Sequence, residues 1–316
     1  MTHHTVGVDI SKCRLDVHRL PEGKTARFTN DAAGFEALIA FIGPSATAVA
    51  YEPTGPYHRH FEETLGKAKL PLVKVNPCQA RRFAQATGER AKTDAVDARM
   101  LAVMAEALKL RPTPPASRRQ RALRELQTAK NALIRQRTAL LNRGAHLTDP
   151  LLKRQHHTQL NLVHRHRKAI DVRIQALIHK DPDLARKAEI IASIPALADN
   201  TAANLLAEMP ELGTLTSKAA ASLAGLAPLA RDSGAFTGRR FIQGGRHAVR
   251  RLLYMPAVTA IRYNPDMKRT YQNLAQRGKP GKVALTAVMR KLLILANALI
   301  QQDRLWTPQA PLNTHA

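Results

Sequence analysis

The segment TVGVDIS, residues 5–11, is a short run rich in β-branched residues that carries an acid, Asp9, near its end. Short apolar runs of this kind are typical of buried strands. The next two segments, CRLDVHRL (13–20) and TARFTN (25–30), alternate apolar and polar residues and predict half-buried strands. A carboxylate that follows an apolar strand is a poor choice for stability. Asp9 is therefore a candidate functional residue.

The rest of the first third continues the alternation of strand and helix. Four segments carry it: a capped helix over 32–42, a strand ending at Glu52, a helix over 56–68 and a strand over 70–77. After Pro77 we expect one long helical stretch that carries Asp94 and Asp97. Three strands followed by alternating helices and strands predict a mixed α/β sheet.

The pattern becomes purely helical after RPTPPAS (111–117), a linker by composition. Leucines recur every seven residues, at Leu126, Leu133, Leu140 and Leu147. A second run, 160–177, has apolar residues at steps of three and four, and Asp149-Pro150 can turn between the two. Lys130 and Arg137 fall where the first helix needs a second apolar row. We interpret this as a helical coiled-coil hairpin whose basic seam meets a partner or a nucleic acid.

The last third is predicted to be mainly helical, with helices over 184–194, 200–209 and 282–300. The fold class is therefore α/β plus all-α. We expect four parts along the chain: an α/β domain (1–112), a coiled-coil hairpin (113–183), a C-terminal domain (184–305) and a tail (306–316).

The amino-acid composition indicates which kinds of molecule the protein binds. The 316 residues include 49 Lys and Arg against 24 Asp and Glu, a formal net charge of +25. A field this positive favours a polyanion, nucleic acid before an anionic membrane surface. Acids concentrate in the first third and basic residues in the remainder. The two cysteines form no metal-binding pair and suit a reducing cytoplasm, and we expect no membrane-spanning segment.

Four carboxylates are candidate metal ligands. Asp94 and Asp97 are three residues apart and share a helical face; taken alone, they are most simply a surface patch offset by Lys92 and Arg99. Asp9 and Glu52, however, both follow apolar strands, and strand ends of α/β sheets commonly point into a site. Four such acids suit two divalent cations, with Mg²⁺ the usual choice beside phosphate. Two ions about 4 Å apart can polarise a phosphodiester.

These residues also carry a family resemblance. GVDISK (7–12), YEPTG (51–55) and KTDAVDA (92–98) resemble, in form and order, the Asp-Glu-Asp-Asp (DEDD) motifs of RuvC-like, ribonuclease H-fold domains. The set is similar to that of the insertion-sequence one-hundred-and-ten family of transposases, which includes the Piv-type DNA invertases. Residues 224–257 closely resemble the family's second domain, and Ser233 matches its catalytic serine. Without the resemblance, Ser233 is more simply a turn residue in the segment RDSG.

The resemblance implies a recombinase in which Ser233 attacks the DNA backbone while the four acids supply Mg²⁺ to the same site from another subunit. It implies donor and target DNA, a structured bridge RNA that pairs with both, and a dimer or tetramer in the bacterial cytoplasm, associated with the nucleoid. We expect seven residues to bind nucleic acid: Lys92, Arg231, Arg239, Arg240, Arg246, Arg250 and Arg251. The chain departs from the family at Ala196 and Ala198, where glycines usually make a turn. Since alanine resists the left-handed backbone, the sequence leaves open whether this turn contacts phosphate.

Three other functions fit parts of the sequence. A structure-selective endonuclease of the Holliday-junction resolvase type needs the four acids but not Ser233. A non-catalytic nucleic-acid-binding protein needs neither. A sugar or acetate kinase-like ATPase shares the ribonuclease H-like fold, but we find no convincing glycine-rich phosphate loop, and the charge of +25 does not suit a small-molecule enzyme.

Overall fold

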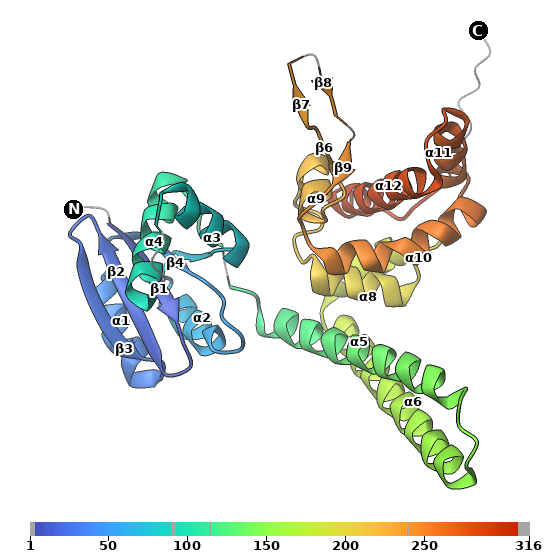
Figure 1. Ribbon diagram of the computed structural model, residues 1–316, viewed down its shortest axis with the longest axis horizontal. Coiled ribbons are helices and arrows are strands. Elements are labelled where there is room, and N and C mark those ends of the chain that lie inside the picture. Colours follow the sequence, from blue (N-terminus) through green and yellow to red (C-terminus); the bar gives the residue numbers. More distant parts are fainter. Residues whose placement is uncertain (1–3, 90–92, 114, 235, 239, 309–316) are drawn as a thin grey trace. The chain divides into compact units, whose positions relative to one another are not determined.

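The computed structural model describes residues 4–89, 93–113, 115–234, 236–238 and 240–308 (Figure 1). The chain divides into two compact units, residues 1–116 and 117–316. The boundary lies at the end of the predicted linker. The finer division of the second unit into a hairpin domain and a C-terminal domain stays a prediction.

The first unit is built on a five-stranded mixed sheet. Its strands are β1 (His4–Ile10), β2 (Arg14–Leu20), β3 (Lys24–Thr29), β4 (Ala46–Tyr51) and β5 (Leu72–Lys74). They lie in the order β3-β2-β1-β4-β5, with the first three antiparallel and β4 and β5 parallel to β1. The predicted strands are confirmed, and this mixed sheet is consistent with a ribonuclease H-like fold.

Helices cover both faces of this sheet. On one face, α1 (Ala32–Ile42) and α2 (His58–Lys67) pack their apolar residues against those of β1 and β2. The predicted cap of α1 is confirmed, because the Asp31 carboxylate accepts a hydrogen bond from the Gly34 N–H. On the other face, α3 (Pro77–Ala86) and α4 (Asp94–Ala107) pack against β1, β4 and β5. This second face, the α4 face, carries the acids.

Gly7 sets how closely α4 approaches the sheet. A Cβ atom added at Gly7 would overlap the carbonyl oxygen of Ala98 and the backbone nitrogen of Ala102, both on α4. Only glycine lets the backbones of β1 and α4 meet this closely. The first turn of α4 is thereby held beside the end of β1.

The prediction of one long helix after Pro77 is wrong. Helix α3 ends at Ala86, and Gly88 follows with a φ of 79°, a left-handed conformation that glycine adopts without strain. Helix α4 then begins at Asp94, where the Thr93 hydroxyl accepts a hydrogen bond from the Val96 N–H. The break places Asp94 and Asp97 in the first turn of a helix, where the helix dipole favours negative charge.

The second unit begins with the expected helical hairpin, formed by α5 (Arg118–Gly144) and α6 (Pro150–His179). Asp149 caps α6 through hydrogen bonds from the N–H groups of Leu151 and Leu152. The apolar seam is confirmed at the buried residues Leu140, Val163 and Ile174. The heptad ends sooner than predicted, however, because α5 stops at Gly144, before Leu147.

The remaining helices share one apolar core. They are α7 (Pro182–Ser193), α8 (Asp199–Glu208), α9 (Ser217–Leu223), α10 (His247–Tyr263), α11 (Pro265–Gln276) and α12 (Gly281–Gln301). Two small strand pairs, which the sequence analysis missed, join α9 to α10. They are β6 (Pro228–Leu229) with β9 (Phe241–Ile242), and β7 (Asp232–Ser233) with β8 (Phe236–Thr237).

Among the described residues, one helix is long and apolar enough to cross a membrane. This helix is α12, with a mean hydropathy of 1.8 over its most apolar window. Half of that window is buried inside the unit, and Val288, Leu292 and Leu299 belong to its core. The burial is typical of a core helix.

Replacing Gly7 with alanine should destabilise the first unit by about 2 to 3 kcal/mol or more, because the added methyl group forces α4 away from β1. Urea unfolding measures this directly. The control is Gly281→Ala, since a methyl group at Gly281 meets only the Tyr271 hydroxyl, at 3.3 Å. Equal stability of Gly7→Ala and the wild type would show that α4 does not depend on this close approach.

Candidate functional site

Asp9 and Glu52 lie at the same edge of the sheet. Strands β1 and β4 are parallel neighbours, and Val8 pairs with Tyr51, so the residues that follow each of them are also adjacent. Gly7 faces α4, and alternation along β1 places Asp9 on the same face. The same alternation places Glu52 with Ala48 and Ala50, which pack in the α4 core. Both carboxylates are half-buried.

Asp94 and Asp97 reach the same edge from α4. Both occupy the first turn of that helix: Asp94 lies about one turn before Ala98, and Asp97 directly precedes Ala98, where the segment that packs on Gly7 begins. Asp94 is exposed and Asp97 is half-buried. The contact at Gly7 therefore brings two helical acids to the end of the strand that carries a third.

The four acids interact electrostatically at Asp9. The pKa of Asp9 is raised from 3.8 to about 6, first by burial and then by the negative charges of Asp94, Asp97 and Glu52. Like charges disfavour ionisation of the group between them. A carboxylate perturbed in this way, by burial together with specific neighbours, marks a candidate functional site.

Asp16 is a fifth acid beside this group, and the sequence analysis did not select it. It pairs with Asp9 across β1 and β2, is buried, and also raises the pKa of Asp9. Its carboxylate accepts a hydrogen bond from Arg27 Nε at 2.7 Å, across the next strand pair. The sequence shows Asp16 as an acid inside an alternating strand. Its position opposite Asp9, however, depends on the register between the two strands, which the sequence does not give.

The carboxylate oxygens of the four acids are suitable ligands for a hard divalent cation. Carboxylate oxygens are the ligands that Mg²⁺ prefers, and a bound cation would relieve the repulsion at Asp9. Within the described residues, however, no three His, Cys, Asp or Glu side chains already form a metal-binding group. If these acids hold metal, their side chains must draw together around it.

Ser233 lies on an exposed hairpin of the second unit. It pairs with Phe236 across β7 and β8, and Gly234, at a φ of 53°, makes the turn. The adjacent Asp232 stiffens this hairpin: its carboxylate accepts hydrogen bonds from the Gly238 N–H at 3.1 Å and from Arg240 Nη1 at 2.7 Å. Sequence analysis saw the Asp-Ser-Gly turn but assigned no role to Asp232.

The basic residues predicted to bind nucleic acid differ in their contacts within the structure. Arg231 stacks over the Phe241 ring, with its guanidinium carbon 4.3 Å from the ring centroid. Arg246 forms a two-pronged ion pair with Glu211, at 2.6 and 2.8 Å, and Arg250 donates to the Gly244 carbonyl. Arg251 is exposed. Lys92 and Arg239 lie outside the described residues, and nucleic-acid binding by all seven predicted residues stays a prediction.

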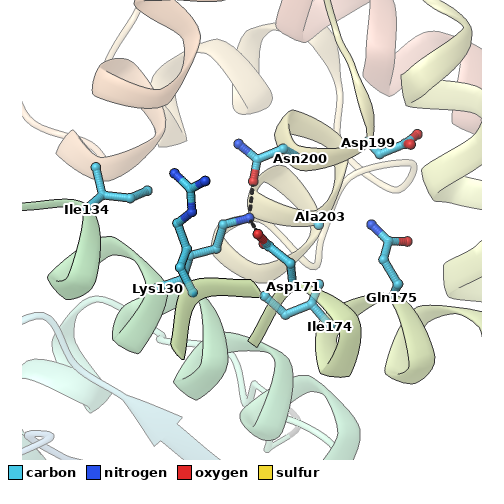
Figure 2. Close-up of a pocket in the computed structure, with 9 residues that line it drawn as sticks. Lys130, Ile134, Asp171, Ile174, Gln175, Asp199, Asn200 and Ala203 are labelled. Carbon is cyan, nitrogen blue, oxygen red and sulfur yellow. Dashed lines mark hydrogen bonds and ion pairs between the residues drawn. The ribbon is translucent and has the colours of Figure 1, made fainter. Parts of the chain in front are cut away.

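The interpretation of Lys130 as part of a basic surface is wrong. Lys130 is buried, and Figure 2 shows its ammonium between Asp171 of α6 and Asn200 of α8. These groups line a pocket of about 310 Å³ between the hairpin and α8. A buried cation needs such partners, so Lys130 joins the hairpin to the helical core. Arg137, one heptad on, is exposed.

The alanine turn has a left-handed residue despite its lack of glycine. Ala196 has a φ of 84°, and a phosphate contact at this turn stays an open question. The conformation costs about 1 to 2 kcal/mol for a residue with a Cβ. The neighbouring Ile194 and Leu197 are fully buried, and their packing offsets this cost.

A mixed sheet with acids gathered on one face, followed by a basic helical unit, is consistent with a protein that acts on nucleic acids. Residues 6–149 match a family model described as the DEDD transposase of IS110, and residues 188–272 match the transposase IS116/IS110/IS902 family. Together the two matches span well over half of the chain. The chain belongs to the IS110 family of transposases, and it is an enzyme that cuts and rejoins DNA.

Its relatives include DNA-inverting and insertion-element proteins. The pilin gene-inverting protein of Moraxella bovis is 29% identical over 323 residues, which cover 96% of this chain and 98% of that protein. An uncharacterized 43.6 kDa protein of insertion element IS110, from Streptomyces coelicolor, is 28% identical over 49% of this chain and 38% of its own length. An IS116 protein from Streptomyces clavuligerus is 35% identical over 41% of this chain and 33% of its own length.

Asp9→Asn should stabilise the metal-free protein at pH 8 by about 1 to 2 kcal/mol. The folded-state pKa of Asp9, about 6, lies above its ordinary value of 3.8. The charged carboxylate therefore costs stability above pH 6, and the cost disappears below pH 3.8. Two pKa units correspond to roughly 3 kcal/mol, reduced here because Asp9 is partly exposed. Thermal unfolding in EDTA across this pH range measures the difference.

Adding Mg²⁺ should reverse the order, because a cation that binds only the folded state raises the stability of the wild type. Glu36→Gln, an exposed acid on α1, is the matched control and should respond to Mg²⁺ like the wild type. Equal protection of wild type and Asp9→Asn by Mg²⁺ would contradict a metal site at Asp9.

Proposed function

We propose that the chain is a site-specific DNA recombinase in which Ser233 is the nucleophile and Asp9, Glu52, Asp94 and Asp97 hold Mg²⁺. The observation that supports the metal site is the grouping of the four acids around the end of β1, where the charges of the other three add to burial in raising the pKa of Asp9. In a chain with a net charge of +25, a cluster of acids serves a polyanionic substrate only when cations neutralise it.

The acids hold and orient the metal. When bound, the metal polarises the phosphodiester and stabilises charge on its oxygens. Glu52 and Asp9 belong to the rigid sheet, and Asp94 and Asp97 to a helix locked on Gly7. All four donors are therefore carried on regular elements, which hold a site more exactly than loops do.

Ser233 supplies the covalent step. Its hydroxyl oxygen attacks the phosphorus atom, the hydroxyl proton passes to a base, and the bond from phosphorus to the leaving strand's oxygen breaks. One DNA end is then joined to Ser233 and the other carries a free hydroxyl group. Attack by the hydroxyl group of a new partner strand reverses these steps and releases Ser233.

Exchange between two DNA sites requires more than one copy of the chain, so we propose a homodimer or tetramer in which the acids and the serine of one site come from different subunits. We also propose a structured bridge RNA that selects donor and target DNA by base pairing. The strongly basic composition supports a load of DNA and RNA together. We place this activity in the bacterial cytoplasm, at the nucleoid.

Ser233→Ala should abolish recombination of a plasmid carrying donor and target sites, by about 1,000-fold or more, and should leave DNA affinity unchanged. The control is Ser222→Ala, which alters an exposed serine on α9. Trapped protein–DNA adducts on a denaturing gel should appear with wild type and not with Ser233→Ala. A variant that still cleaves DNA but cannot rejoin it would favour the structure-selective endonuclease instead.

Asp232→Ala should lower the recombination rate by about 100-fold, because the hairpin loses two hydrogen bonds and Ser233 loses its position. Asp232→Asn keeps the acceptor for the Gly238 N–H and should retain part of the rate. Single-turnover kinetics, with DNA affinity measured in parallel, separate positioning from binding. A wild-type rate in Asp232→Ala would show that the hairpin does not position Ser233.

A further inference from the structure

Helix α10 has two unlike faces. Its buried face, formed by Val249, Leu253, Ala257 and Ala260, belongs to the core of the second unit. Figure 1 shows α10 in orange, and it contacts α8, α11 and α12. The opposite face is exposed and carries His247, Arg251, Tyr254, Met255 and Arg262. We call these five residues the α10 stripe.

The stripe follows the helical period. From His247, the other members lie four, seven, eight and fifteen residues on, so all fall within one side of the helix. Over fifteen residues the stripe is about 22 Å long, which matches roughly six stacked bases at about 3.4 Å each. Along it, Arg251 and Arg262 lie on either side of Tyr254 and Met255, and the sequence of α10 contains no acid.

The apolar members of the stripe are exposed and do not belong to the apolar core of the second unit. Tyr254 is 48% exposed and Met255 is 62% exposed, although only 4% of the chain is aromatic. The two arginines beside the stripe make contacts within the second unit: Arg246 pairs with Glu211, and Arg250 donates a hydrogen bond to the Gly244 carbonyl. These contacts fix the start of α10 and leave Arg251 exposed on the stripe.

We propose that the α10 stripe binds a single-stranded segment of nucleic acid, with an unpaired base stacked on Tyr254 and phosphates held by Arg251 and Arg262. Aromatic rings beside cations are how proteins bind unpaired bases, because every base has a face that can stack. The proposal deepens the proposed function by adding single-stranded nucleic acid, DNA or RNA, to its partners.

Other occupants fit the stripe less well. A second copy of the chain, related by two-fold symmetry, would set cations of one stripe against cations of the other. Duplex DNA could meet the arginines, but the faces of its bases are already stacked within the helix and cannot cover Tyr254. Unpaired bases satisfy the charges and the ring together.

The test uses the full chain in EDTA, so that no strand is cut, and measures binding by fluorescence anisotropy at one fixed salt concentration. The probes are an oligothymidine about ten nucleotides long, the matched oligouridine, an abasic backbone of equal length and a duplex. Tyr254→Ala should weaken binding to the two base-bearing single strands by about tenfold. It should leave binding to the duplex and the abasic strand unchanged. Unequal losses for thymidine and uridine strands show which nucleic acid the stripe prefers.

Tyr263→Ala is the matched control. Tyr263 is on the same helix and is 71% exposed, but nine residues separate it from Tyr254, which places it about 180° around the helix. Tyr263→Ala should bind all probes like the wild type. Tyr254→Phe, which keeps an aromatic ring, should bind the two base-bearing single strands about tenfold more tightly than Tyr254→Ala. Arg251→Ala should weaken every probe, the abasic strand included.

Three results would overturn the proposal: no loss with Tyr254→Ala, an equal loss on all four probes, or the same loss with Tyr263→Ala. A change of oligomeric state in Tyr254→Ala, seen by sedimentation, would instead assign the stripe to contact between copies. Because the assay needs neither Ser233 nor metal, it can fail while the recombinase function stands, and recombination can fail while the stripe binds bases.

Discussion

The contact between Gly7 and α4 is the constraint on which the rest of the first unit depends. A strand and a helix normally keep the distance that two layers of side chains require. Here one strand position has no side chain, and the helix backbone lies against it. The consequence reaches beyond packing, because Asp9 lies two residues along the strand and Asp97 one residue before Ala98. A glycine thus determines where the carboxylates meet.

The repulsion between these carboxylates lowers the stability of the folded state, and a cation bound between them would relieve it. Burial and the neighbouring acids raise the pKa of Asp9 to about 6, so at neutral pH the folded protein holds negative charges that repel one another. The helix dipole at the start of α4 offsets part of that repulsion. Asp16 adds to it but is held by Arg27. Under the proposed function, a bound cation would relieve the remaining repulsion.

The second unit uses its charges in two different ways. Some cations are bound within the unit: Lys130 joins the hairpin to α8, and Arg246 ties the start of α10 to Glu211. Others, such as Arg251, are exposed. The net charge of +25 therefore overstates the surface available to nucleic acid, and burial and ion pairs show which basic residues remain available to it.

The sequence by itself determined the strands, most helices, the helical hairpin, and the four acids with Ser233 as candidates, because periodicity and strand-end acids are local features. It could not show that the helix after Pro77 breaks at Gly88, since glycine permits both conformations. It also could not show that Ala196 adopts a left-handed backbone, which the burial of Ile194 and Leu197 holds in place. Tertiary structure alone decided that Asp16 faces Asp9, that Lys130 is buried, and that Tyr254 and Arg251 are exposed. These facts depend on register and packing between segments far apart in the chain, which no local pattern records.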